Sequence, residues 1–349
     1  MRLLISLLAL STLLFTADNS RAGVHSRRVG SLPGQPFDRH ECVDALGRTV
    51  TYYLSEKKGE AALPLLVFVQ GSGSQPLFPK VEGKIRGSLQ NHLWDVLHPH
   101  ARVLCVEKPG VTPFEQVDSP GTALDASPVF KREHVLDRWT TAIAAALRAA
   151  HHRSDIDTSK TLVVGHSEGG LVACRLAAND PTITHVASLA GGGTTQLFDL
   201  VELARRGHLY GGAARDPEAR AQRLLADWQA VLAAPHDAEA LFLGHPNRRW
   251  TSFLADSPID ALRDTDARVF LAQGTADHAT ITAAVDALHA DLLVRGRDVT
   301  YLRVDGGDHA FARASANERP SDGFRRVFRE MRDWFLADPE ARKVAAATR

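Results

Sequence analysis

The chain has 349 residues, which is enough for one large domain or two small ones around a sizeable buried core. Lys plus Arg and Asp plus Glu each number 41, so the net charge gives no sign of a polyanionic partner such as nucleic acid. The three cysteines are too few for a disulfide framework and form no CxxC pair for zinc. Composition therefore indicates a soluble globular protein.

The first segment has the pattern of a secretory signal peptide. Arg2 precedes an apolar run over residues 3–15, and a polar segment follows that run. The run is shorter than the roughly 20 residues that a membrane-spanning helix needs, which disfavours the alternative of a membrane anchor. We expect a signal peptide over residues 1–22, no membrane span, and a secreted or periplasmic protein.

Strands alternate with helices along the rest of the chain. Residues 39–54 predict a β-hairpin, and short continuous apolar runs typical of strands covered on both faces follow it. These runs lie at residues 63–69, 102–106, 161–164, 185–189, 269–272 and 299–304. Helical spacing of apolar residues appears at residues 134–150, 167–178, 281–295 and 324–336. The alternation predicts an α/β fold with a mostly parallel sheet and helices on both faces, over residues 39–340.

One long excursion interrupts this alternation. Residues 194–260, which we call the inserted segment, contain helical patterns only. An excursion of that length between two core strands is typical of a cap or lid, and the alternative is an ordinary extra layer of helices. We expect a helical cap.

The sequence GHSEG at residues 165–169 stands directly between an apolar strand and a helix. Such a position places Ser167 on a sharp turn that lifts its Oγ above the sheet, next to the amide groups of the helix. The strand-to-helix context therefore predicts that Ser167 is the nucleophile of an acyl transfer.

A serine nucleophile needs a base and an acid that orients the base. Asp277 in GTADHA follows the strand at residues 269–272, and His309 in DGGDHAF follows the strand at residues 299–304. The sharp strand-to-helix turn that carries Ser167 is called an elbow. The order Ser, Asp, His along the chain is the one expected for a nucleophile on such an elbow. His309 is the predicted base, and Asp277 is predicted to hold its imidazole ring.

Other residues compete for these two roles. His278 is the rival base, but it immediately follows Asp277 and is badly placed to donate a hydrogen bond to that carboxylate. Asp305 and Asp308 are rival acids, although the position of Asp277 after its strand fits better.

A further loop supplies candidate oxyanion donors. QGSG at residues 70–73 follows the strand at residues 63–69. We expect the backbone amides of Ser72 and Glu168 to form an oxyanion hole, since paired amides stabilise the charge of an acyl-transfer intermediate.

Together, QGSGS, EKPGV (residues 107–111), GHSEGG, GTADH and GGDH resemble the α/β-hydrolase superfamily over about residues 40–340. The elbow and the inserted segment are similar to those of bacterial secreted esterases and of prolyl-oligopeptidase-like or serine-aminopeptidase-like hydrolases. Gln70 departs from the His that many members carry before the oxyanion glycine. The resemblance implies hydrolysis through an acyl-enzyme, without a metal or an organic cofactor.

The sequence thus leads us to expect a serine hydrolase that cleaves a small carboxylic ester. The alternative is a peptidase, in which Glu202 or Asp227 binds the amino terminus of the substrate. A non-catalytic binding protein is disfavoured by the complete triad. Trp228, Trp250 and Phe253 either line the substrate pocket or pack beneath it.

Overall fold

The computed structural model describes residues 26–212, 216–263 and 265–337. The expected signal peptide, residues 1–22, lies outside the described residues, as does the end of the expected domain beyond residue 337. Within these three ranges, no helix combines the length and the apolar character needed to cross a membrane.

A nine-stranded sheet forms the centre of the fold. Its first strands pair antiparallel up to the contact between β3 and β7, and all later neighbours pair in parallel. In sheet order, the strands are β1 (Arg27–Ser31), β2 (Phe37–Val43), β3 (Thr49–Ser55), β7 (Arg102–Val106), β4 (Leu63–Val69), β8 (Ile156–His166), β9 (His185–Leu189), β12 (Arg268–Gly274) and β13 (Val299–Val304). A separate two-stranded ribbon joins β5 (Lys80–Val81) to β6 (Lys84–Ile85).

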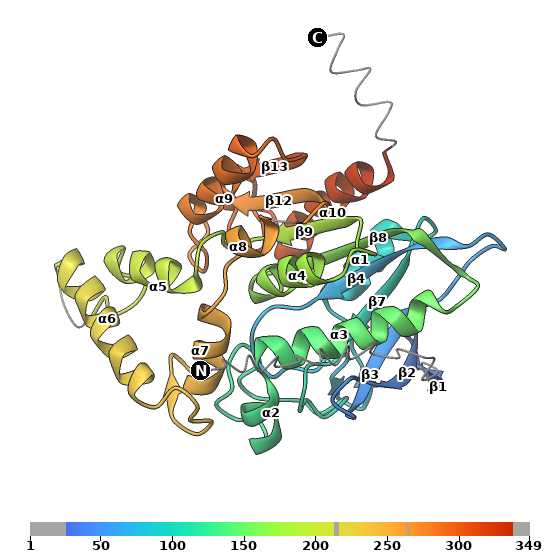
Figure 1. Ribbon diagram of the computed structural model, residues 1–349, viewed down its shortest axis with the longest axis horizontal. Coiled ribbons are helices and arrows are strands. Elements are labelled where there is room, and N and C mark those ends of the chain that lie inside the picture. Colours follow the sequence, from blue (N-terminus) through green and yellow to red (C-terminus); the bar gives the residue numbers. More distant parts are fainter. Residues whose placement is uncertain (1–25, 213–215, 264, 338–349) are drawn as a thin grey trace, which may run out of the picture.

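Helices cover both faces of this sheet (Figure 1). One hydrophobic cluster includes side chains of α3 (Leu136–His151), α4 (Glu168–Asn179) and α9 (Thr282–Val294). The cluster on the opposite face includes side chains of α1 (Leu89–Leu97) and α10 (Pro320–Leu336). Strand β4 contributes Leu65 and Val67 to the first cluster and Leu66 and Phe68 to the second. Alternate residues of a strand point to opposite faces, which explains why a doubly covered strand has a continuous apolar sequence.

The predicted α/β-hydrolase architecture is confirmed. The structure has all the predicted core strands and the helices at α3, α4, α9 and α10. It adds elements that the sequence patterns did not predict, including β1, α1 and the short helix α2 (Pro128–Glu133).

The inserted segment lies between β9 and β12 and has a small core of its own. It contains α5 (Gln196–Arg205), α6 (Pro217–Ala233), β10 (Leu241–Phe242), β11 (His245–Pro246) and α7 (Asn247–Leu254), and its end overlaps α8 (Pro258–Leu262). Helices α5 and α6 extend to one side of the sheet (Figure 1). Leu200 and Leu224 of these helices pack with Phe242 and Trp250.

The expectation that this segment is helical throughout is wrong at the β10–β11 hairpin. Leu243 and Gly244 both have positive φ, 47° and 79°. Two consecutive residues of this kind form the turn that suits a two-residue β-hairpin, and the glycine adopts it without steric cost.

Candidate active site

The three predicted catalytic side chains lie at the same edge of the sheet. Ser167 follows β8, Asp277 lies in the loop after β12, and His309 lies in the loop after β13. These strands are parallel to one another through β9, so their carboxyl ends meet where ligands bind in open α/β sheets.

Ser167 stands on a strained turn between β8 and α4. Its φ of 57° and ψ of −129° are unusual for a residue with a side chain. A Cβ atom on Gly165 would lie 1.8 Å from the carbonyl oxygen of Gly169, and one on Gly169 would lie 2.3 Å from that of Val69. Both glycines of GHSEG are therefore required for the turn to pack against itself and against β4.

Asp277 and His309 form a direct hydrogen bond. His309 Nδ1 lies 2.8 Å from Asp277 Oδ2, and the carboxyl group of Asp277 also accepts bonds from Ala279 N at 2.7 Å and Thr280 Oγ1 at 2.8 Å. Burial by itself would raise the pKa of Asp277, but the bond to His309, its charge and these other donors outweigh burial and lower the pKa to about 2. Asp277 is thus an ionised partner that fixes the orientation of the ring.

The rival residues have other contacts. The ring of His278 packs against that of His208, with centroids 4.2 Å apart. Asp305 accepts a bond from Thr275 Oγ1, and Asp308 accepts the amide of Ala310. None of the three is hydrogen-bonded to His309 among the described residues.

Ser167 and His309 are not hydrogen-bonded to each other within the described part of the chain. They belong to adjoining loops, because the ring of His166 bonds to the backbone carbonyl of His309. Ser167 lines a small cavity of about 40 Å³ that extends to Thr280, beside the Asp277 loop. Catalytic hydrogen bonds are often long before substrate binds.

The loop at residues 70–73 lies directly against the nucleophile. A Cβ atom on Gly71 would be 3.1 Å from Ser167 Cβ and 3.6 Å from Ser167 Oγ. The amides of Ser72 and Glu168, the two expected oxyanion donors, find no acceptor among the described residues. The structure thus brings both amide-bearing segments next to Ser167.

The side chain of Glu168 lies in a buried polar cluster that sequence patterns did not reveal. Arg249 of α7 donates to Glu168 Oε2, and His134 Nε2 lies 3.1 Å from Oε1. The side chains of all three residues are 2% exposed or less. Burial, with the charges of Lys108 and Arg249, holds the pKa of His134 well below its usual range, so its ring is neutral. The inserted segment is therefore tied through an ion pair to the residue that follows the nucleophile.

Asp199 of α5 is a second acidic residue near Ser167 that the sequence analysis did not single out. It lines the same cavity as Ser167 and accepts the amide of Ile281 at 2.8 Å. Burial raises the pKa of Asp199 to about 7. The sequence signal was its place on the first helix after GGG, but only the fold shows that this helix faces the elbow.

The residues proposed for substrate contact lie elsewhere. Glu202 pairs with Arg205, and Asp227 accepts a bond from Tyr210 at 2.7 Å, so neither lines the cavity at Ser167. Trp250 and Phe253 are buried, with 3% and 0% exposure. Trp250 packs in the core of the inserted segment, and Phe253 packs in the hydrophobic cluster on one face of the sheet.

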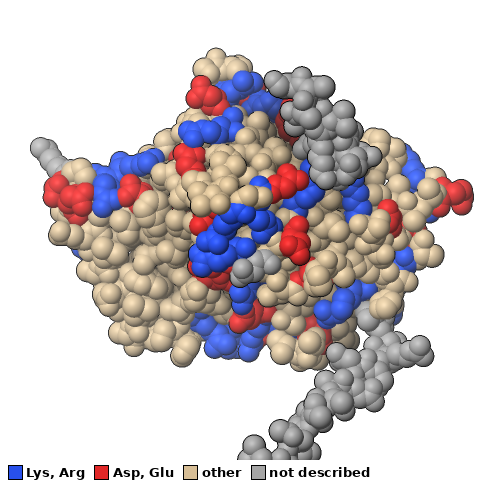
Figure 2. All heavy atoms as spheres, turned by 45° about the horizontal axis from the view of Figure 1, so that its top comes forward, with Lys and Arg blue, Asp and Glu red and all other residues tan. Residues whose placement is uncertain are grey.

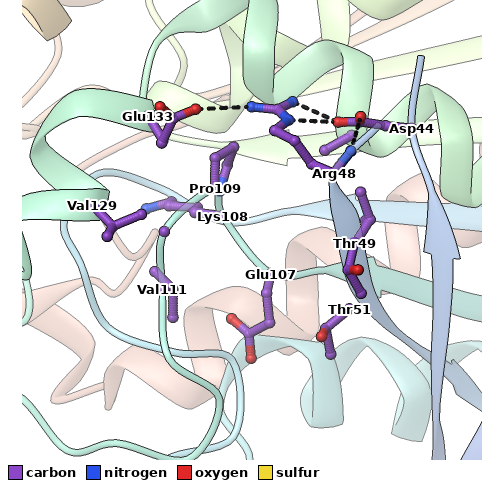
Figure 3. Close-up of a pocket in the computed structure, with 13 residues that line it drawn as sticks. Asp44, Arg48, Thr49, Thr51, Glu107, Lys108, Pro109, Val111, Val129 and Glu133 are labelled. Atoms are coloured by element: carbon purple, nitrogen blue, oxygen red, sulfur yellow. Dashed lines mark hydrogen bonds and ion pairs between the residues drawn. The ribbon is translucent and has the colours of Figure 1, made fainter. Parts of the chain in front are cut away.

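A larger cavity, of about 430 Å³, lies apart from these residues (Figure 3). Thr49 and Thr51 of β3 face the segment after β7, which includes Glu107, Lys108 and Val111. Arg48 closes it from above in this view through ion pairs with Asp44 and Glu133. None of the predicted catalytic side chains lines this cavity.

The sequence model of the Alpha/beta hydrolase family matches residues 66–327. The match covers more than half of the chain and includes the elbow and both loops that carry Asp277 and His309. This protein belongs to the Alpha/beta hydrolase family. No curated protein sequence matches the chain.

Solved structures with the same fold include both esterases and peptidases. Est1E from Butyrivibrio proteoclasticus, with bound ferulic acid, has a TM-score of 0.57 and 16% identity, over 85% of this chain and 99% of that one. A Mycobacterium tuberculosis puromycin-hydrolyzing peptidase has a TM-score of 0.54 and 16% identity, over 86% of this chain and 40% of that one. The Pyrococcus horikoshii acylaminoacyl peptidase has a TM-score of 0.56 and 12% identity, over 86% of this chain and 41% of that one. At these identities, the likeness shows the fold alone.

Proposed function

We propose that this hydrolase cleaves a carboxylic ester through a covalent acyl-enzyme on Ser167. The observation that carries the proposal is the 2.8 Å bond between His309 and the buried Asp277, at the sheet edge where Ser167 stands on its strained turn. The amides of Ser72 and Glu168 are the proposed oxyanion donors.

In the first half of the reaction, His309 Nε2 takes the proton of Ser167 as Oγ attacks the ester carbonyl. The carbonyl oxygen becomes an anion that the two amides stabilise, and the C–O bond to the alcohol then breaks as His309 returns the proton to the leaving oxygen. In the second half, water attacks the acyl-enzyme with His309 again as base, which releases the acid and restores Ser167. Asp277 stays ionised throughout and stabilises the imidazolium.

Replacing Ser167 with Ala tests this function. We expect turnover of an activated short-chain ester such as p-nitrophenyl butyrate to fall by about 10⁶-fold, and labelling by a fluorophosphonate probe to disappear. Retained turnover or labelling in the folded variant would exclude Ser167 as the nucleophile.

A peptidase is the second candidate, favoured by Asp199. A carboxyl group in the cavity beside Ser167 suits the amino terminus of a peptide better than Glu202 or Asp227, which lie outside it. A panel of aminoacyl and acyl reporter substrates separates the two candidates. A preference for aminoacyl substrates that is lost in Asp199→Asn would support the peptidase. Equal turnover of acyl substrates by the parent protein and by Asp199→Asn would support the esterase.

Export remains part of the proposal. The supporting observation is the signal-peptide pattern of residues 1–22. Amino-terminal sequencing of the protein recovered from culture medium or periplasm tests it, and an intact Met1 in that fraction would contradict cleavage.

A further inference from the structure

Lys108 has a buried side-chain amine that the reaction scheme does not use. It follows β7 and is 2% exposed. Its Nζ lies 5.1 Å from the ring centre of Trp139 on α3. Burial and the charge of Arg249 hold the pKa of Lys108 well below its usual range, and a buried amine needs hydrogen-bond acceptors around it.

Those acceptors are the two carbonyl groups on either side of Ser72. Lys108 Nζ donates to the carbonyl oxygen of Gly71, and to that of Gly73 at 2.6 Å. The neighbouring Glu107 is occupied differently, since it accepts bonds from Tyr53 Oη at 3.0 Å and the amide of Leu77 at 3.2 Å. The amine of Lys108 therefore donates to the loop at residues 70–73 and not to a carboxylate.

We call the two bonds from Lys108 Nζ to the carbonyl groups of Gly71 and Gly73 the Lys108 clamp. The geometry of the peptide bond links this clamp to the oxyanion hole. In a planar trans peptide, the C=O of one residue and the N–H of the next point in opposite directions. A carbonyl of Gly71 held toward Lys108 therefore directs the amide of Ser72 away from Lys108. That peptide lies beside the nucleophile, because a Cβ atom on Gly71 would be 3.1 Å from Ser167 Cβ.

Without the bond from Lys108, the peptide group between Gly71 and Ser72 would have more freedom to rotate. Glycine on both sides of Ser72 allows backbone conformations that other residues rarely adopt, and Gly73 has a φ of 93°. An oxyanion donor is effective only when it is oriented before the charge develops.

We propose that Lys108 is a positioning residue, which holds the carbonyl groups of Gly71 and Gly73 so that the amide of Ser72 stays directed at the oxyanion. This inference rests on the proposed serine hydrolase function.

The test compares Lys108→Met and Lys108→Arg in the full chain with the parent protein. Met keeps the length and the packing but has no donor, whereas Arg keeps donors and charge. Arg102→Met is the matched control, because Arg102 is a buried basic residue at the start of β7, whereas Lys108 follows the end of that strand, and Arg102 is paired with Asp155. Each protein is assayed for kcat and KM with p-nitrophenyl butyrate, for inhibition by phenylboronic acid, and for thermal unfolding. Phenylboronic acid forms a tetrahedral adduct with an active-site serine that carries an oxyanion.

For Lys108→Met, we expect kcat to fall about 10- to 100-fold and KM to change less than about threefold, since the lost orientation matters only when charge develops. The inhibition constant of phenylboronic acid should rise by the same factor as kcat falls. Lys108→Arg should recover part of both, and Arg102→Met should unfold at a lower temperature with an unchanged kcat.

The inference is overturned if Lys108→Met keeps kcat within about twofold, or if kcat falls while binding of phenylboronic acid is unchanged. An equal loss of kcat in Arg102→Met would also overturn it. If Lys108→Met does not fold, Lys108→Leu, which also lacks a donor, replaces it, with the same expectations for kcat and inhibition. Fluorophosphonate labelling of the parent protein that requires Ser167 tests the proposed function separately, and its rate in each variant reports on Lys108 even if the ester is a poor substrate.

Discussion

The ring of His166 is hydrogen-bonded to the backbone carbonyl of His309, with 3.0 Å between Nε2 and the oxygen. Burial, together with the charge of His309, lowers the pKa of His166 to about 3, so the ring is neutral and its Nε2 must carry the proton that it donates. The residue before the nucleophile therefore anchors the loop of the base.

Replacing His166 with Phe should weaken this anchor and leave the packing largely intact, because the ring already packs edge-on against Phe324. We expect kcat/KM for an activated ester to fall about 2- to 10-fold, the value of one ordinary hydrogen bond. His185→Phe is the control, since His185 is another buried histidine, at the start of β9 and between Trp334 and Phe335. An equal loss in both variants would contradict a specific role for the His166 bond.

Asp277→Asn should lower kcat by about 10⁴-fold with little change in KM, because the amide no longer holds the productive tautomer of His309 or stabilises its charged form. Steady-state kinetics measure this effect. Asp305→Asn should keep nearly full activity, and a loss there as large as in Asp277→Asn would transfer the role of the acid to Asp305.

Arg249→Met should destabilise the protein by about 3–5 kcal/mol, because it leaves the buried carboxylate of Glu168 without its cation. The double variant Arg249→Met with Glu168→Gln should recover much of this loss, as urea unfolding would show. Arg263→Met removes an exposed ion pair with Asp260 and should change the free energy of unfolding by less than about 1 kcal/mol. No recovery in the double variant would mean that the two side chains are not coupled.

Glu107→Gln should flatten the pH dependence of stability. Burial raises the pKa of Glu107 to about 7, against bonds from Leu77 and Tyr53 that act in the other direction. The folded protein therefore binds this proton more tightly than the unfolded chain, whose pKa is 4.5. The contribution of Glu107 to the free energy of unfolding is therefore largest below pH 4.5 and is lost as the pH rises through about 7.

Gln cannot ionise, so the fall in unfolding free energy between about pH 5 and pH 8 should be smaller in the variant. Asp199, whose pKa is also raised to about 7, keeps part of the dependence. A slope equal to that of the parent protein would show that Glu107 does not titrate in this range.

The sequence was sufficient to predict most of the sheet. Strands β4, β7, β9 and β13 have the boundaries expected from their apolar runs. Strands β7 and β9 are buried along their whole length and carry that signal clearly, whereas β13 is a half-buried edge strand. Helix α1 was not predicted, because its few buried residues, such as Leu93 and Leu97, are separated by polar ones. The β10–β11 turn was not predicted because Leu243 gives no sign of a positive φ.

The residues of the candidate site also fall into those that local motifs predict and those that only the fold brings together. Ser167, Asp277 and His309 were found from motifs that directly follow strands, and the structure brings Asp277 and His309 into contact. Arg249 was not found, because it is 81 residues from Glu168 in the chain and no local pattern reports such a pair. Lys108 was visible within EKPGV, but its partners are carbonyl groups of a loop that precedes it by more than 30 residues.

The ion pair between Arg249 and Glu168 also bears on how new substrate specificities can be built on this scaffold. Changing Asp199 in α5 would alter the cavity beside Ser167, but Gln196 of the same helix accepts a bond from Arg249 at 3.5 Å and should be kept. A transplanted segment that replaces α7 must bring its own cation to Glu168, or the elbow must be neutralised by Glu168→Gln in the same step. The inserted segment is therefore interchangeable only in part, and the elbow sequence sets the limit.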